Sequence, residues 1–130
     1  MKSKRGVQMD QLLNFLKCIA DENRLKILKL LLDGEYCVCQ LQQLLDKSQS
    51  SVSQHLSYFK ELELLKEEKN GKWIYYAVDR TVYDRYLADL ISLKADNLAE
   101  LNLSELQNKI DNLDTAAEIK SGAKGGCCYG

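Results

Sequence analysis

Two pairs of closely spaced cysteines carry most of the reactive chemistry that this sequence could support. Cys37 and Cys39 are separated by one residue, Cys127 and Cys128 are adjacent, and the fifth cysteine is Cys18. Thiolates bind soft metal ions such as Cd(II) and Pb(II), and trivalent arsenic prefers three sulfur ligands. In a cytosolic protein, such clusters are typical of metal or redox sites rather than disulfide staples. We therefore expect sulfur-based sensing or coordination.

No other reactive site in the sequence competes with these thiols. His55 is the only histidine, and the sequence contains no nucleophile–base constellation, Gly-rich phosphate loop or pair of general acids. The position of His55 beside a predicted apolar face favours a packed, hydrogen-bonded histidine over a metal ligand. Two interpretations from other classes stay open: a thiol-dependent reductase that uses Cys127 and Cys128, and a module that only binds proteins. The pattern nevertheless favours a switch over an enzyme.

Helical periodicity places the first cysteine pair at the start of a short helix. Asp21 and Ser48 are predicted N-caps of the second and fourth helices, and Gly34 is a predicted helix end. Residues at i and i+2 point to different sides of a regular helix, so Cys37 and Cys39 can face one ion only where the helix start is distorted or extended. The apolar stripes of four consecutive helices run through residues 9–19, 25–32, 39–45 and 52–62.

A hairpin and two more helices are predicted after the fourth helix. Asn70 and Gly71 form a strong turn signal between two extended runs, 64–69 and 72–78, which predicts a two-stranded wing. Helical spacing then returns. These elements divide the chain into a basic N-terminal arm (1–8), a DNA-binding and dimerisation domain (9–95), a helical extension (96–121) and a flexible Gly/Cys tail (122–130).

The predicted fold class is mainly α with a small β-hairpin, in the form of a winged helix-turn-helix. The fourth helix has one apolar face and one face of small polar groups, which suits a helix that enters the major groove of DNA. Nearby lysines could neutralise phosphates. The candidate DNA-binding residues are Ser48, Gln49, Ser50, Ser51, Ser53, Gln54, His55, Tyr58, Lys60, Lys69 and Lys72.

The distribution of charge is compatible with a DNA partner, although the formal net charge is only −1. Residues 1–30 contain seven Lys and Arg against three Asp and Glu, and the last third of the chain is acidic. A dimer could therefore present a basic face. No apolar run approaches the ~20 residues of a membrane span, and no signal-peptide core follows the basic start. We expect a cytoplasmic protein without a membrane partner.

Four segments occur in the order seen in one protein family. They read DENRLKIL (21–28), EYCVCQL (35–41), SQSSVSQHL (48–56) and GKWIYY (71–76). In this pattern, residues 10–95 resemble the ArsR/SmtB metalloregulatory repressors. The resemblance implies a homodimeric winged-helix repressor whose dimer contacts come from the first and last helices. It also implies binding to double-stranded operator DNA, and release of that DNA when a toxic metal ion or metalloid binds.

The Cys37-Val38-Cys39 element resembles the thiolate site of the arsenic/antimony and cadmium/lead sensors of that family. The resemblance implies As(III) or Sb(III) as the effector, with Cd(II) or Pb(II) as an alternative and no organic cofactor. Zinc is disfavoured because no histidine follows His55. A thiol-redox or persulfide sensor stays open as a repressor of different chemistry.

The third sulfur of an arsenic site is the open question of this sequence. The arsenic-type motif often has another cysteine three positions after the second, and Gln42 stands there. The candidates for the missing ligand are Cys127, Cys128 and Cys18. Core packing is favoured for Cys18, because it lies on the apolar side of the first helix. The predicted metal ligands are therefore Cys37, Cys39, Cys127 and Cys128.

Overall fold

The computed structural model describes residues 8–113, which form six helices and one antiparallel hairpin. The predicted mainly α fold with a small hairpin is confirmed. The predicted domain boundary after residue 95 stays a prediction, although the fifth helix ends there. In chain order the elements are α1 (Met9–Ile19), α2 (Glu22–Asp33), α3 (Val38–Leu45), α4 (Gln49–Glu61), β1 (Leu65–Asn70), β2 (Trp73–Val78), α5 (Arg80–Ala95) and α6 (Ser104–Asp111).

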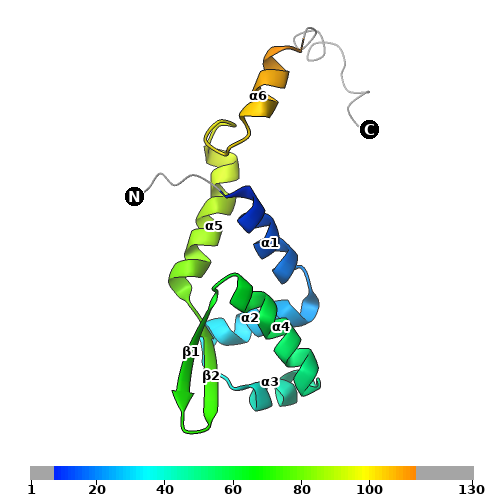
Figure 1. Ribbon diagram of the computed structural model, residues 1–130, viewed down its shortest axis with the longest axis vertical. Coiled ribbons are helices and arrows are strands. Elements are labelled where there is room, and N and C mark those ends of the chain that lie inside the picture. Colours follow the sequence, from blue (N-terminus) through cyan, green and yellow to red (C-terminus); the bar gives the residue numbers. More distant parts are fainter. Residues whose placement is uncertain (1–7, 114–130) are drawn as a thin grey trace.

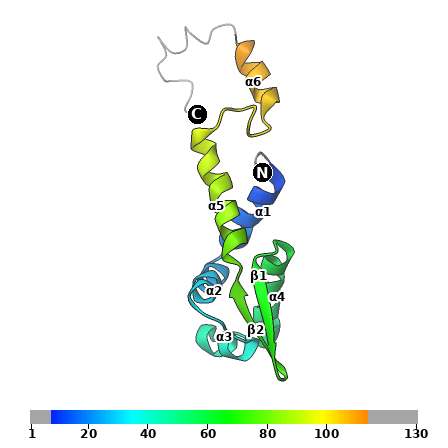
Figure 2. The same cartoon turned by 90° about the vertical axis from the view of Figure 1, so that its left-hand side faces the viewer.

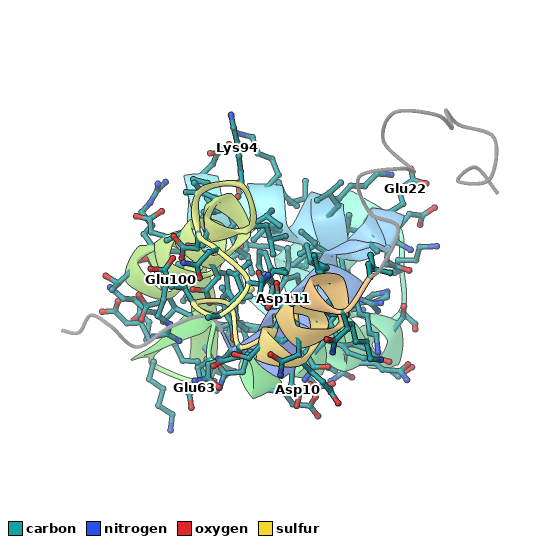
Figure 3. The ribbon with its side chains drawn as sticks, turned by 90° about the horizontal axis from the view of Figure 1, so that it is seen from above. Asp10, Glu22, Glu63, Lys94, Glu100 and Asp111 are labelled. Atoms are coloured by element: carbon teal, nitrogen blue, oxygen red, sulfur yellow. The ribbon has the colours of Figure 1, made fainter. Side chains whose placement is uncertain are left out.

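The hairpin and helices α2, α3 and α4 gather at one end of an elongated molecule (Figure 1). Helices α1 and α5 lie side by side beyond them, and α6 extends past the end of α5 (Figure 2). Seen along the long axis, the charged side chains of Glu22, Glu63 and Lys94 point outward (Figure 3). Within residues 8–113, no helix has both the length and the hydropathy that crossing a bilayer requires.

One continuous core joins α1 to the helices and hairpin below it. The ring of Phe15 stacks on that of Tyr86, with centroids 4.6 Å apart and 2° between the ring planes. This stacking holds α1 against α5. Leu101 is only 3% exposed, so the linker after α5 also packs into the core. The largest fully buried side chains are Phe15, Phe59, Leu12, Ile27, Leu31, Leu41, Leu56, Leu64 and Val52.

Two predicted caps and one predicted helix end are confirmed. The Asp21 carboxylate accepts a hydrogen bond from the backbone N–H of Arg24 at 3.0 Å, and the Ser48 hydroxyl accepts one from Ser51 at 3.1 Å. Gly34 follows the last residue of α2, and its backbone is extended, with φ at −170°. These local signals therefore set where α2 and α4 begin and where α2 ends.

The hairpin turn lies one residue later than the sequence predicts. Asn70 pairs with Trp73 as the last residue of β1, so the two turn residues are Gly71 and Lys72. Gly71 has a φ of +66°, and glycine at the first position of a two-residue turn is the type II′ arrangement. The expected turn at Asn70 and Gly71 is corrected accordingly, because glycine tolerates positive φ better than asparagine does.

A short β-bridge, which the sequence does not predict, connects the segment before α3 to the wing. Tyr36 and Tyr76 exchange backbone hydrogen bonds of 3.0 and 2.9 Å, which makes Tyr36 an isolated third partner of the hairpin. The next residue in the chain is Cys37. The bridge therefore holds Cys37 beside β2.

Candidate thiol site and nucleic-acid interface

Cys37 and Cys39 occupy different environments at the start of α3. Cys37 is buried, and its backbone is extended, with φ −91° and ψ 170°. Its N–H donates to the side-chain oxygen of Gln40 at 3.0 Å, and its carbonyl accepts the first hydrogen bonds of the helix. Cys39 is helical and exposed, and both thiols are free. The extended start that a shared site requires is therefore present.

Both cysteines line one open hollow of about 380 Å³. One wall is the first turn of α3 with Gln42, the second is the start of α4, and the third is strand β2 with the turn before it. The β2 wall could not be predicted from the sequence, because the Tyr36–Tyr76 bridge that brings the strand there is a tertiary contact. The lining residues are Cys37, Val38, Cys39, Gln42, Gln49, Lys72, Trp73, Ile74 and Tyr76.

The predicted four-cysteine site is only partly described. Within residues 8–113, no cluster of three or more His, Cys, Asp or Glu side chains is arranged to hold a metal ion. Gln42, at the position of the absent third cysteine, also lines the hollow. Cys127 and Cys128 lie outside the described residues, so their part in the site stays a prediction.

Cys18 does not join the other two thiols. It is 3% exposed and lines a different hollow, together with Arg24 and Tyr58. Burial raises the pKa of the Cys18 thiol to about 11, although the nearby Arg24 guanidinium opposes the rise. The thiol therefore stays protonated at neutral pH and offers no ready thiolate ligand.

The outer face of α4 presents the small polar side chains that the sequence predicts. Ser50, Ser53 and Gln54 are exposed, whereas Val52 and Leu56 on the opposite face are buried in the core. The remaining candidates on this segment are also exposed, except Ser51 and His55, which are half-buried. The arrangement leaves a polar surface free for an external partner.

Arg24 is an organising residue that the sequence pattern does not single out. Its Nε donates to the Cys18 carbonyl at 2.6 Å, its Nη1 lies 3.2 Å from His55 Nδ1, and its guanidinium lies 4.2 Å from the centroid of the Tyr58 ring. One cation thus connects α1, α2 and α4. Its position three residues after the Asp21 cap is the only sequence signal that could have drawn attention to it.

His55 is packed and hydrogen-bonded, as its position beside the apolar face predicts. A guanidinium can only donate, so His55 Nδ1 accepts and its proton is on Nε2. Burial lowers the pKa of His55, and the positive charges of Arg24 and Lys47 lower it further, while Asp21 raises it. The ring is therefore neutral at neutral pH.

The candidate lysines lie on the hairpin and at the end of α4. Lys60 Nζ lies 4.0 Å from a Glu67 carboxylate oxygen and 5.2 Å from the centroid of the Tyr76 ring, which ties the helix end to the wing. Lys69 and Lys72 are exposed near the hairpin turn. Lys72 also borders the thiol hollow, so the hollow and the predicted phosphate contacts share a residue.

Comparisons with known proteins place this geometry in a family. Residues 21–67 match the model described as "Bacterial regulatory protein, arsR family". The chain is 46% identical over 65 residues to the arsenical resistance operon repressor of Escherichia coli K12, which covers 49% of this chain and 56% of that protein. The longer match, to the transcriptional repressor SmtB homolog of Synechocystis, is 31% identical over 93 residues and covers 72% and 67%. The chain belongs to the ArsR family.

Similarity to solved structures confirms the winged helix-turn-helix, and one further curated relative is a metal-resistance regulator. The cadmium resistance regulatory protein CadC of Listeria innocua is 40% identical over 65 residues, 49% of this chain and 55% of that protein. Reduced HlyU from Vibrio cholerae is 30% identical with a TM-score of 0.53, covering 68% of this chain and 93% of that one. The homodimeric winged helix-turn-helix domain Mb0332 from Mycobacterium bovis has 27% identity, a TM-score of 0.54, and coverage of 68% and 81%.

The matches to the metal-resistance regulators cover only part of those proteins. The chain spans about half the length of the arsenical and cadmium resistance regulators that it matches. The relatives named here are described as transcriptional regulators and not as enzymes, which agrees with the sequence-based interpretation.

Proposed function

We propose that this ArsR-family chain is a homodimeric transcriptional repressor that releases its operator DNA when cysteine thiolates bind As(III) or Sb(III). The observation that carries the proposal is the shared hollow of Cys37 and Cys39, which lies between α3, the start of α4 and the wing. An ion held there would lie beside the start of α4 and beside the wing, the two parts of a winged helix that are expected to contact DNA. A relative described as an arsenical resistance operon repressor supports the choice of ion.

The exposed polar face of α4 is the proposed base-reading surface. Ser, Gln and Asn side chains can follow base edges in the major groove without steric bulk, and lysines neutralise phosphates. Ser50, Ser53 and Gln54 are exposed there, and Lys69 and Lys72 are exposed on the wing. His55 and Tyr58 also position α4 through Arg24, so their proposed role includes holding the reading helix at its angle.

A second copy of the chain is the proposed partner of α1, α5 and α6. Helix α6 buries no side chain, and Ile91 of α5 is 68% exposed. Apolar side chains left open on consecutive helices favour association with another apolar surface. The exposed apolar residues on these three helices and after α6 are Leu13, Ile91, Leu93, Leu106, Ile110 and Leu113.

The proposed switch acts through the start of α3. Two sulfurs bound to one ion would constrain both the extended Cys37 and the helical Cys39, and Tyr36 would pass that constraint to β2. Release requires that the ion bind more tightly to the conformation that does not grip DNA. A loss of operator affinity of about 100-fold corresponds to roughly 2.7 kcal/mol of coupling. Cys127 or Cys128 is the proposed source of a third sulfur for inorganic arsenic.

The experiment is a titration of the repressor–operator complex with arsenite, antimonite, Cd(II), Pb(II), Zn(II) and an oxidant. Arsenite or antimonite should free the DNA, and Cys37→Ser or Cys39→Ser should abolish release while operator affinity stays within about twofold of the native value. Cys18→Ala is the matched control and should respond like the native chain. Release by arsenite that survives in both serine variants would refute the proposal.

A repressor of the same fold that responds to Cd(II) or Pb(II) is the second candidate. It is supported by the similarity of this chain to the cadmium resistance regulatory protein CadC. The same titration separates the two candidates, because release by Cd(II) without release by arsenite would select this one. Release by the oxidant alone would instead select a thiol-redox sensor, for which two free thiols in one hollow are also suited.

A further inference from the structure

The guanidinium of Arg24 is held in place by contacts with two other helices. Its Nε donates to the Cys18 carbonyl of α1 at 2.6 Å, and its Cζ lies 4.2 Å from the centroid of the Tyr58 ring on α4. Nη1 of the same group lies 3.2 Å from Nδ1 of His55. Because Tyr58 follows His55 by three residues, both side chains lie on one side of α4. Arg24 therefore keeps one N–H aimed at the imidazole ring.

The contact between Arg24 and His55 decides which ring nitrogen carries the proton. A guanidinium has only donors, so Nδ1 accepts and the proton of the neutral ring lies on Nε2. The other tautomer would place two N–H donors opposite each other at 3.2 Å. Burial lowers the pKa of His55, and the charges of Arg24 and Lys47 lower it further although Asp21 raises it, so the ring is neutral at neutral pH. His55 therefore offers one N–H, at Nε2.

This Nε2–H reaches the surface of the molecule. Within residues 8–113, the hydrogen bonds of the His55 ring involve Nδ1 alone, and no buried side-chain nitrogen or oxygen lacks a partner. Nε2 is therefore not buried, which agrees with the half-buried state of the ring. Lys47, whose charge acts on the ring, and Tyr58, which shares Arg24 with it, are both exposed. A cation, a phenol and an outward N–H together suit the acceptor atoms of DNA.

We propose that Arg24 is a positioning residue for operator binding: it holds His55 in one orientation and in the Nε2–H tautomer, so that the ring presents a single donor to a hydrogen-bond acceptor of the DNA. This inference rests on the proposed function only in that the chain binds an operator through α4, and not on which ion releases it. The acceptors open to such a donor are phosphate oxygens and, in the major groove, guanine N7 and O6, adenine N7 and thymine O4. The amino group of cytosine is excluded, because it is itself a donor.

The first measurement reads the tautomer from the ring itself. His55 is the only histidine, so proton–nitrogen correlation spectra of the full chain report its two ring nitrogens without ambiguity. The native chain at neutral pH should show the Nε2–H tautomer alone, and Arg24→Leu should show a mixture. Lys29→Leu, which removes an exposed cation from the same helix, is the matched control and should keep the native spectrum. A native proton on Nδ1, or a tautomer that Arg24→Leu leaves unchanged, would overturn the inference.

Two substitutions of His55 separate the outward donor from the contact with Arg24. The side-chain oxygen of His55→Asn can still accept from Arg24 near the place of Nδ1, but no donor extends to the place of Nε2. The longer amide of His55→Gln can donate there, but no acceptor stands at Nδ1. Affinity for an operator selected from random-sequence duplexes should fall about tenfold in His55→Asn and stay within about threefold of the native value in His55→Gln. Equal affinities of the two variants would overturn the inference.

A double-mutant cycle distinguishes positioning of the ring from general support of the fold. Arg24→Leu should weaken operator binding about tenfold in the chain with His55, because the ring can then rotate and adopt the second tautomer. In the His55→Gln background the same substitution should cost only about twofold, because an amide has no tautomer for Arg24 to set. Equal losses in both backgrounds would mean that Arg24 only supports the packing of α4, and would overturn the inference.

The sequences selected from the random duplexes identify the acceptor. If the acceptor is a base edge, His55→Asn relaxes the preference at one base pair of each half-site, and if it is a phosphate oxygen, all sequences weaken uniformly. Either result accompanied by the tenfold loss supports the inference. A native chain that binds no duplex even at low salt would overturn this inference and the proposed function together. A native chain that binds DNA and is not released by arsenite would overturn the proposed function alone.

Discussion

The two ends of this molecule differ in how far their amphipathic helices bury apolar side chains within one chain. At the winged end, α4 buries Val52, Leu56 and Phe59 almost completely within a single chain. At the other end, α6 has the same kind of amphipathic spacing and buries none of its residues. Helix α4 meets α2 and α3, whereas α6 extends past the end of α5 (Figure 1). The core of the winged end is therefore closed within one chain, although Leu25 and Leu44 stay exposed there, and the opposite end has an apolar surface that a second chain can cover.

The largest expected effect tests whether the winged end closes its core alone. Phe59 is 0% exposed and belongs to the hydrophobic core, so we expect Phe59→Ala to leave a cavity there. We expect a loss of about 3–5 kcal/mol in the free energy of unfolding, measured by urea denaturation. The exposed Ser53→Ala is the control and should change it by less than about 0.5 kcal/mol. A loss below about 1 kcal/mol at Phe59 would mean that the core is looser than described.

The next effect tests whether a second copy covers α6. Leu106 and Ile110 are each 47% exposed on one face of the helix, and charges there would oppose burial against another chain. The double variant Leu106→Glu/Ile110→Glu should raise the dimer dissociation constant about 100-fold, measured by sedimentation equilibrium, without loss of helical content. Lys109→Glu, on the exposed surface of the same helix, is the matched control. An unchanged dissociation constant in the double variant would show that α6 lies outside the dimer interface.

The smallest effect concerns the contact that fixes α4 at the winged end. Burial lowers the pKa of His55, and the groups that face it are Asp21 and Arg24 from α2 and Lys47 before α4. Because the folded state binds the proton more weakly than the unfolded state, stability falls as the pH drops below about 6.5 towards the lowered pKa.

The measurement is the urea denaturation midpoint at pH 7.5 and pH 5.5. The decrease between these values should be smaller in His55→Gln than in the native chain, because glutamine does not titrate in this range. Asp21 is the carboxylate coupled to His55, and its pKa is already held below its ordinary value, so it stays ionised in both proteins across this pH range. An identical decrease in both would mean that His55 binds its proton equally well in the folded and unfolded states.

Local signals were sufficient for most of the helices. The caps Asp21 and Ser48 and the end at Gly34 were predictable, because each depends on hydrogen bonds or backbone angles within a few residues. The hairpin was predictable as an element, but its turn was misplaced by one residue. The pairing of Asn70 with Trp73 makes Gly71 the first residue of the turn, and Gly71 has the positive φ that this position requires.

The candidate site was predictable in its sulfurs and not in its walls. Cys37 and Cys39 follow from the sequence alone, including the need for an extended start to α3, which the structure has. Trp73 could not be assigned to the site, because it lies far along the chain and reaches the hollow only through the wing. The role of Arg24 is not predictable from the sequence for the same reason, since its partners His55 and Tyr58 are on another helix.

The sequence by itself determined the close spacing of two thiols, the helices and the polar face of α4, because residue type and short-range spacing are enough to specify each of them. Only the tertiary structure decided which surfaces those thiols meet. The Tyr36–Tyr76 bridge carries β2 to the start of α3, and that single long-range pairing turns a Cys-Val-Cys segment into a hollow with an aromatic wall. Such a contact joins residues about forty positions apart, and periodicity within one element carries no information about it.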